Sequence, residues 1–306
     1  MKKSFSLLLL SISLFTSCKT DTNQSEHHAV NENTLLDTTG SSTEFLKHLH
    51  KKRTLKTYDQ SLEEYLSSGP RVPDSIQKII YLLPIGDVDT TYINFLDKER
   101  DYLERFFQLE VKLLPAVTIN DLKVNNVKTR LHSASQMYGK GAEEANDEQI
   151  EANSLLKNYV IPNKPKDGIV VLGVTDYDIY NPKYNYIFGT SDLHDGTGII
   201  STNRLLGETS IHNVLTKQIT NIFSIPNTKD YDCLLNFQDT PIQEEMSVSY
   251  LSPLALQKLK IAIGFDYLKR FEELEQYWST RHHVDNSKYY RDCIAACKKF
   301  NSKTGR

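Results

Sequence analysis

The sequence has no excess of positive charge and no long apolar run. Its 36 lysines and arginines face 39 aspartates and glutamates, which gives a formal net charge of −3 over 306 residues. A mildly acidic chain without a basic stripe argues against a nucleic acid as partner. The apolar run at residues 5–15 is shorter than the roughly 20 residues that a membrane-spanning helix needs. No segment of the chain is repeated.

Cysteine is scarce, with four residues in the whole chain. Cys293 and Cys297 are four apart on a predicted helix, which is too far for an easy disulfide. A disulfide between Cys233 and one of these two cysteines is an alternative that the sequence leaves open. Because these three make an odd number, at least one thiol would be unpaired within the chain in an oxidising compartment.

The N-terminus has the pattern of a bacterial lipoprotein signal. Lys2 and Lys3 precede the apolar run, and Thr16, Ser17 and Cys18 follow it. This order predicts a signal peptide at residues 1–17 and a lipid on Cys18. An ordinary secretory signal with an incidental cysteine is the alternative. We therefore expect attachment to a membrane of the bacterial cell envelope through the lipid, with inner or outer membrane left open.

Composition and periodicity divide the rest of the chain. Residues 18–43 are polar and predict a flexible tether. Residues 44–75 predict one or two short helices, and residues 261–306 predict a helical extension. Between them, residues 79–84, 92–107 and 109–114 follow a strand, helix, strand pattern, and the continuous apolar run at 168–174 predicts a buried strand. These features predict an α/β fold with a largely parallel sheet. Residues 136–156 are polar and predict a helix.

Residues 169–180 read IVVLGVTDYDIY, and residues 233–237 read CLLNF. These blocks resemble the segments VLGVTDxDLY and CxMNF of the archaemetzincins, a family of zinc metalloproteases of the metzincin clan. Residues 185–189, 198–205 and 251–259 resemble further blocks in the same order. The resemblance covers about residues 76–260. It implies a metzincin-like mixed sheet with an active-site-type helix.

The catalytic motif of that family is HExxHxxGxxH, two histidines one helical turn apart and a third after a glycine bend. At the matching positions this chain carries Lys217, Gln218, Asn221, Ser224 and Asn227. A protonated lysine has no lone pair, and an amide cannot take the proton of a zinc-bound water. The resemblance therefore implies a site without zinc, without another cofactor and without the hydrolytic mechanism. Leu235 replaces the methionine beneath the zinc.

The family's second, structural zinc site is depleted as well. Thr228, Ser252 and Ala255 take the place of three cysteines, and Cys233 alone remains. The predicted strands around both sites nevertheless keep the sequence pattern of the family.

An apolar stripe predicts an amphipathic helix at residues 208–223. Lys217 and Asn221 share another face of this helix. That face is either the solvated side of a scaffold helix or a surface that binds a ligand, for instance with Lys217 holding a carboxylate. His194 and His212 lie near the expected cleft and could form an improvised metal site with a nearby carboxylate, for which the candidates are Asp192, Asp195 and Asp232.

We therefore expect a catalytically inactive archaemetzincin-like lipoprotein, a pseudoenzyme of the envelope whose cleft binds a peptide or protein. Two alternatives remain. One is a metal-dependent peptidase with relocated ligands, His194 and His212. The other is a structural subunit of an envelope assembly, in which Lys217 pairs with a nearby acid and closes the cleft.

Overall fold

Two apolar runs form the central strands of the sheet, β1 (Ile79–Ile85) and β5 (Gly168–Thr175). They pair in parallel, and every residue of both is buried. The computed structural model that shows them describes residues 40–53, 59–118, 127–133 and 146–304. The predicted signal at 1–17, Cys18 and most of the predicted tether at 18–43 lie outside the described residues.

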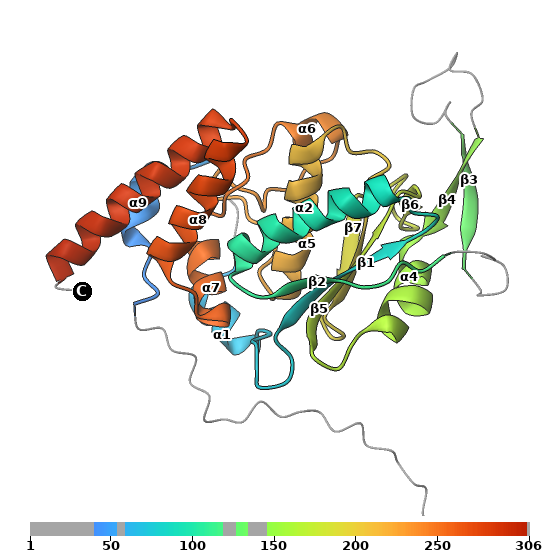
Figure 1. The fold of residues 1–306 in the computed structure, drawn as a ribbon, viewed down its shortest axis with the longest axis horizontal. Helices are drawn as coiled ribbons and strands as arrows, with labels where there is room; N and C mark the ends of the chain where they lie inside the picture. The colour runs from blue at the N-terminus through green and yellow to red at the C-terminus, as the bar shows by residue number, and fades with distance from the viewer. Residues whose placement is uncertain (1–39, 54–58, 119–126, 134–145, 305–306) are drawn as a thin grey trace, which may run out of the picture. The chain divides into compact units, whose positions relative to one another are not determined.

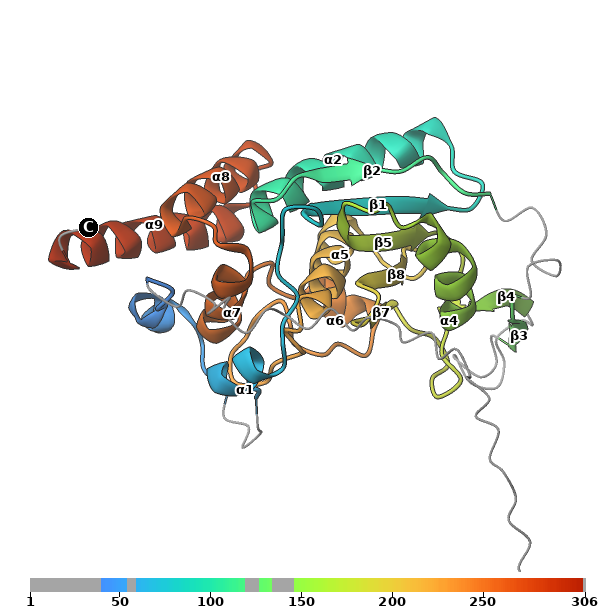
Figure 2. The same cartoon turned by 90° about the horizontal axis from the view of Figure 1, so that it is seen from below.

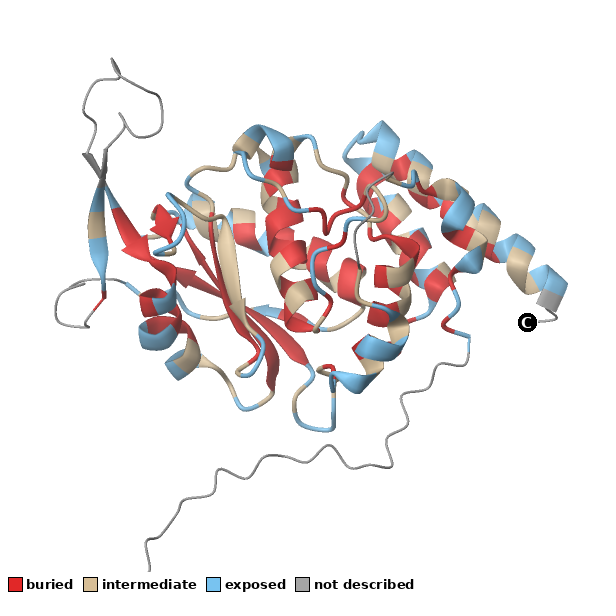
Figure 3. Cartoon of the chain, turned by 180° about the vertical axis from the view of Figure 1, so that it is seen from behind, coloured by how far each residue is buried: buried red, intermediate tan, exposed pale blue. Residues whose placement is uncertain are grey.

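The sheet has five strands in the order β2–β1–β5–β8–β7 (Figure 1). β2 (Val111–Leu113) and β8 (Thr197–Ser201) extend the parallel part, whereas the edge strand β7 (Gly189–Asp192) runs antiparallel to β8. β7 is half-buried along its length and β8 is fully buried (Figure 3). The predicted α/β class with a mixed, largely parallel sheet is confirmed.

Alternate residues of β1 enter two different cores, as the two-residue period of a strand requires. Ile80 and Leu82 join the larger core, which includes residues of α2 (Thr90–Phe107) and α5 (Glu208–Ile222). Tyr81 and Leu83 join a smaller core beneath α4 (Ala152–Leu155) and a turn of π-helix at Leu156–Val160. A 3-10 turn at Ile161–Asn163 leads on to β5. Helices therefore cover both faces of the sheet (Figure 2).

Helix α2 completes the predicted strand, helix, strand start. The side chain of Asp89 accepts a hydrogen bond from Tyr92 N and caps its first turn. The described chain ends with the helices α7 (Pro253–Ile263), α8 (Tyr267–Thr280) and α9 (Val284–Thr304). None of the helices among the described residues combines the length and the apolar composition that crossing a membrane demands.

The first described segment packs against these C-terminal helices. It contains a 3-10 turn at Glu44–Leu49, and helix α1 (Leu62–Ser67) follows in the next described range. Tyr267 Oη donates to Ser41 O at 2.6 Å, and Thr43 Oγ1 donates to Pro253 O at 2.8 Å. Phe45 stacks on Phe300 with a centroid distance of 5.0 Å. The two ends of the described chain therefore share one core.

The helix predicted at residues 136–156 is wrong over most of its described part. Asn146–Glu151 forms strand β4, which pairs antiparallel with β3 (Thr129–Ser133) and parallel with β6 (Ile179–Tyr180). Helical structure is confined to the residues after Glu151. The polar composition suggested a helix, but pairing with two neighbouring strands decides the local structure. Residues 136–145 lie outside the described part.

Candidate functional site

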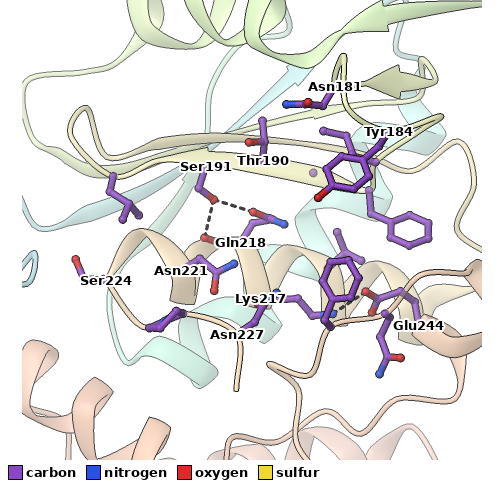
Figure 4. Close-up of a pocket in the computed structure, with 18 of the residues that line it drawn as sticks. Asn181, Tyr184, Thr190, Ser191, Lys217, Gln218, Asn221, Ser224, Asn227 and Glu244 are labelled. Carbon is purple, nitrogen blue, oxygen red and sulfur yellow. Dashed lines mark hydrogen bonds and ion pairs between the residues drawn. The ribbon is translucent and has the colours of Figure 1, made fainter. Parts of the chain in front are cut away.

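A cavity of about 1100 Å³ lies between the edge strand β7, helix α5 and the segment that leads into α6 (Pro241–Glu245) (Figure 4). The apolar stripe of α5 faces the core through Leu215, Ile219 and Ile222. Because a helix turns by about 100° per residue, Lys217 and Asn221 face away from that stripe and Gln218 lies at its flank. They face the cavity.

The positions that the resemblance assigns to the catalytic zinc lie together in this cavity. Lys217, Gln218, Asn221, Ser224 and Asn227 all line it. Lys217 and Asn221 lie one turn apart on α5 (Figure 4). The structure thus gathers the replaced residues in one concave site.

Lys217 is not solvated. Its Nζ lies 2.6 Å from Glu244 Oε1, and the two residues are 5% and 2% exposed. Burial raises the pKa of the Glu244 carboxyl, while the Lys217 charge opposes the rise. The prediction of a solvated polar face is therefore wrong at Lys217, because α6 covers this side chain.

Sequence reasoning did not find Glu244. The one local signal is a capping box, in which Thr240 Oγ1 accepts from Gln243 N and the Gln243 side chain accepts from Thr240 N. That signal places a short helix after Thr240 and thereby orients Glu244. It says nothing of the partner on α5.

Gln218, at the position of the catalytic base, is bound to the opposite wall. Its Oε1 accepts a hydrogen bond of 2.7 Å from Ser191 Oγ on β7. The contact joins α5 to the edge strand (Figure 4). An amide in this place can position a neighbour but cannot accept a proton from water.

Ser224 keeps the backbone conformation for which glycine is suited. Its φ is 65°, in the left-handed region where a side chain is unfavourable. α5 ends at Ile222, and the chain reverses before Pro226. The bend of the motif is therefore present even though its glycine is absent.

The four positions of the second zinc site converge in the interior. Thr228 Oγ1 and Cys233 Sγ lie 3.0 Å apart, and Ser252 Oγ caps α7 by accepting from Ala255 N. The four residues are at most 7% exposed. Burial raises the pKa of the Cys233 thiol, which favours an inert, hydrogen-bonded group. Leu235 nearby is fully buried.

The two histidines of the alternative metal site are not brought together in the cavity. His212 is buried, with Nδ1 bound to Glu99 and Nε2 2.9 Å from Tyr277 Oη. It precedes Lys217 by five residues, so it points to a different side of α5. His194 lies exposed at the cavity rim and contacts Asp195.

Among the described residues, neither histidine belongs to a larger group of metal-ligating side chains. In the described ranges there is no group of three or more histidines, cysteines and carboxylates that could hold a metal ion. Cys233, Cys293 and Cys297 are free, buried thiols. The possible bridge from Cys233 to the C-terminal cysteines is thus not formed.

Comparison with known proteins gives a consistent result, although no family model matches the chain. Archaemetzincin-2 of Pongo abelii is 26% identical over 258 residues, covering 70% of this chain and 68% of the relative. Archaemetzincin-2 of Homo sapiens is 25% identical over the same coverage. Archaemetzincin of Pyrococcus furiosus is 21% identical over 206 residues, covering 63% of this chain and 98% of the relative. The chain is related to the archaemetzincins.

Solved archaemetzincin structures also align with it. The archaemetzincin from Archaeoglobus fulgidus, complexed with malonate, is 22% identical and covers 59% of this chain and 99% of its own, with a TM-score of 0.43. The archaemetzincin from Methanopyrus kandleri is 18% identical, covers 62% and 97%, and has a TM-score of 0.45.

Proposed function

We propose that this archaemetzincin relative is catalytically inactive and uses its retained cleft to bind a peptide or protein segment. The observation that carries the proposal is the buried Lys217–Glu244 pair. The pair occupies the part of the cavity where the resemblance places the first zinc ligand, and Glu244 fills the space beside that position.

The donor set in the cavity does not suit zinc. Zn²⁺ is held in proteins by imidazole, thiolate and carboxylate groups. Lys217 presents a cation, and Asn221 and Asn227 present neutral amides. The carboxylate of Glu244 faces Lys217, so its charge is already balanced.

Peptide binding is supported by the edge strand. Among the described residues β7 pairs only with β8, so its other side carries backbone groups free to pair with an extended chain. Residues 189–191 of this strand line the cavity. An extended peptide that adds to a sheet edge gains main-chain hydrogen bonds, while pockets read its side chains.

The test measures metal and activity on one sample. The purified full-length protein is dialysed against trace zinc, analysed for bound transition metal, and assayed for peptide hydrolysis with and without chelator. We expect less than about one-tenth of an equivalent of metal and no hydrolysis, because an ammonium group and neutral amides are poor ligands for zinc. Peptide hydrolysis that a chelator abolishes would overturn the proposal.

We further propose that the protein is a lipoprotein of the bacterial envelope, anchored through Cys18. The support is the order of basic, apolar and small residues before that cysteine. Metabolic labelling with a radioactive fatty acid should mark the wild-type protein and leave Cys18→Ala unlabelled. Equal labelling of both proteins would exclude this anchor.

A second candidate is a structural subunit of an envelope assembly. The observation in its favour is that Lys217 has an internal partner, as this function requires. Affinity capture from membranes distinguishes the two. A structural subunit retains stoichiometric partners when residues of the cavity wall are replaced, whereas a cleft-binding protein loses them.

A further inference from the structure

Two acceptor oxygens at the inner end of the cavity lack a donor. Within the described part of the chain, no group donates to Glu244 Oε2 or to Asn221 Oδ1, although both atoms are buried. Both residues line the cavity, and Figure 4 shows them on either side of Lys217. A buried acceptor without a partner is unfavourable, so a ligand that supplies a donor here gains affinity from satisfying it.

The charge of the donor is restricted by Lys217. Its ammonium lies 2.6 Å from the other oxygen of the same carboxylate. A cationic group that reached Oε2 would therefore stand close to a like charge in a site largely closed to solvent. An anionic group would meet the Glu244 carboxylate and the Asn221 carbonyl oxygen. A neutral donor avoids both penalties.

The remaining ionisable groups of the cavity do not change this balance. His194 and Asp239 line it as well, but both are exposed to solvent, which screens their charges. The inner end is therefore governed by the Lys217–Glu244 pair and the two unsatisfied oxygens.

The rim of the cavity carries three large, exposed aromatic or aliphatic side chains. Tyr184, Leu193 and Phe237 are 57%, 51% and 60% exposed, and all three line the opening. Large apolar side chains that remain exposed around a concave site are typical of a surface that a ligand covers. They suit apolar side chains on either side of the group that enters the cavity.

We propose that the cleft selects an uncharged, apolar stretch of peptide whose backbone N–H groups donate to Glu244 Oε2 and Asn221 Oδ1. This inference rests on the proposed peptide-binding function and narrows it. It also reverses the polarity expected of a zinc peptidase, in which the metal draws in a carbonyl oxygen as a Lewis acid. Here the inner end of the cavity takes the N–H side of the peptide bond.

The experiment uses four libraries of pentapeptides that are acetylated and amidated at their ends. The outer positions are leucine, valine or phenylalanine, and the central residue is glycine, N-methylglycine, lysine or glutamate. Binding to the purified full-length protein is measured by fluorescence anisotropy. We expect the glycine library to bind most tightly. The N-methylglycine library, which lacks the central N–H, should bind about tenfold more weakly, since one hydrogen bond to a charged or buried acceptor corresponds to about that ratio. The lysine and glutamate libraries should also bind more weakly, because their central side chains bring a charge to the Lys217–Glu244 pair.

Replacing one acceptor locates the effect. Asn221→Ala should reduce the preference for glycine over N-methylglycine several-fold. The matched control is Asn153→Ala, an exposed asparagine of α4 outside the cavity, which should keep the preference. Thermal unfolding monitored by circular dichroism verifies that both variants fold.

The possible failures can be told apart. If none of the four libraries binds the wild-type protein, the proposed peptide-binding function is overturned. If the libraries bind with equal affinity, or the lysine or glutamate library binds best, peptide binding stands and the selection of a neutral N–H donor is overturned.

Discussion

Lys217 Nζ lies 2.6 Å from Glu244 Oε1, and this contact joins α5 to α6 in the interior of the cavity wall. Both charges lose their hydration when the protein folds, so each depends on the other to offset the cost of desolvation. The pair therefore stabilises the wall only as long as both partners are present.

Lys217→Met should lower the free energy of unfolding by about 3–5 kcal/mol, because it leaves Glu244 buried without its counter-charge. Adding Glu244→Gln to the same protein should recover much of this loss. Denaturant unfolding of the single and double variants measures both. The control is Lys288→Met, which removes an exposed ion pair with Asp292 and should cost less than about 1 kcal/mol. Equal effects at the two lysines would show that the buried pair does not form.

Ser224→Gly should raise the free energy of unfolding by about 0.5–1 kcal/mol. Ser224 has a φ of 65°, which a glycine adopts without the steric cost of a side chain. Ser279→Gly is the control, since Ser279 lies within helix α8, where glycine costs about as much as it gains at 224. A loss of stability in both variants would contradict the left-handed bend.

His50 should make the protein acid-sensitive. Burial, aided by the nearby charge of His48, lowers the pKa of His50 from 6.5 to about 4. A histidine whose folded pKa is depressed binds fewer protons in the native state than in the unfolded one. Its stabilising contribution is therefore complete above pH 6.5 and is lost as the pH falls towards 4, by up to about 3 kcal/mol.

The measurement compares unfolding of wild type and His50→Phe between pH 4 and pH 8. Phenylalanine keeps the ring among Tyr231, Tyr250 and Tyr289 and removes the titrating group. The variant should be less sensitive to acid over this interval. His194→Gln, at an exposed histidine, should follow the wild-type profile. Parallel curves for wild type and His50→Phe would show that His50 titrates normally.

Thr228→Cys, Ser252→Cys and Ala255→Cys, combined in one protein, should bind about one zinc ion per chain. Together with Cys233 they would supply four thiolates, the ligand set of a structural zinc site. Thr228 contacts Cys233 directly, and Ser252 contacts the backbone of Ala255. Elemental analysis under reducing conditions measures the metal. The control is Thr228→Cys alone, which provides two thiols together with Cys233 and should retain little zinc. A triple variant that binds no zinc would mean that the four positions do not converge.

The sequence predicts the layered core well because its signals there are local. The continuous apolar runs of β1 and β5 and the stripe of α5 each follow from burial. The grouping of Lys217, Asn221 and Asn227 in one cavity follows from the resemblance of the flanking blocks, since nothing in these three residues alone marks a site.

What the sequence does not reveal depends on contacts between distant segments. Glu244 lies 27 residues beyond Lys217 on a separate short helix, and no pattern links the two. Strand β4 has the composition of an exposed helix, yet Gln149 is buried and donates to Asp178 beside β6. The position of His212 outside the cavity could not be predicted either, because it depends on the orientation of α5 in the fold.

The docking of the first described segment on the C-terminal helices has a mechanical consequence. Ser41 and Thr43 are held by Tyr267 and Pro253, and neither partner belongs to the sheet or to α5. A pulling force that arrives along the chain from upstream of Ser41 would be borne first at these hydrogen bonds and at the one that Gln257 Nε2 of α7 donates to Ser41 Oγ. The wall formed by β7 and α5 lies off that path, so tension on the N-terminal side would reach α7 and α8 before it deformed the cavity.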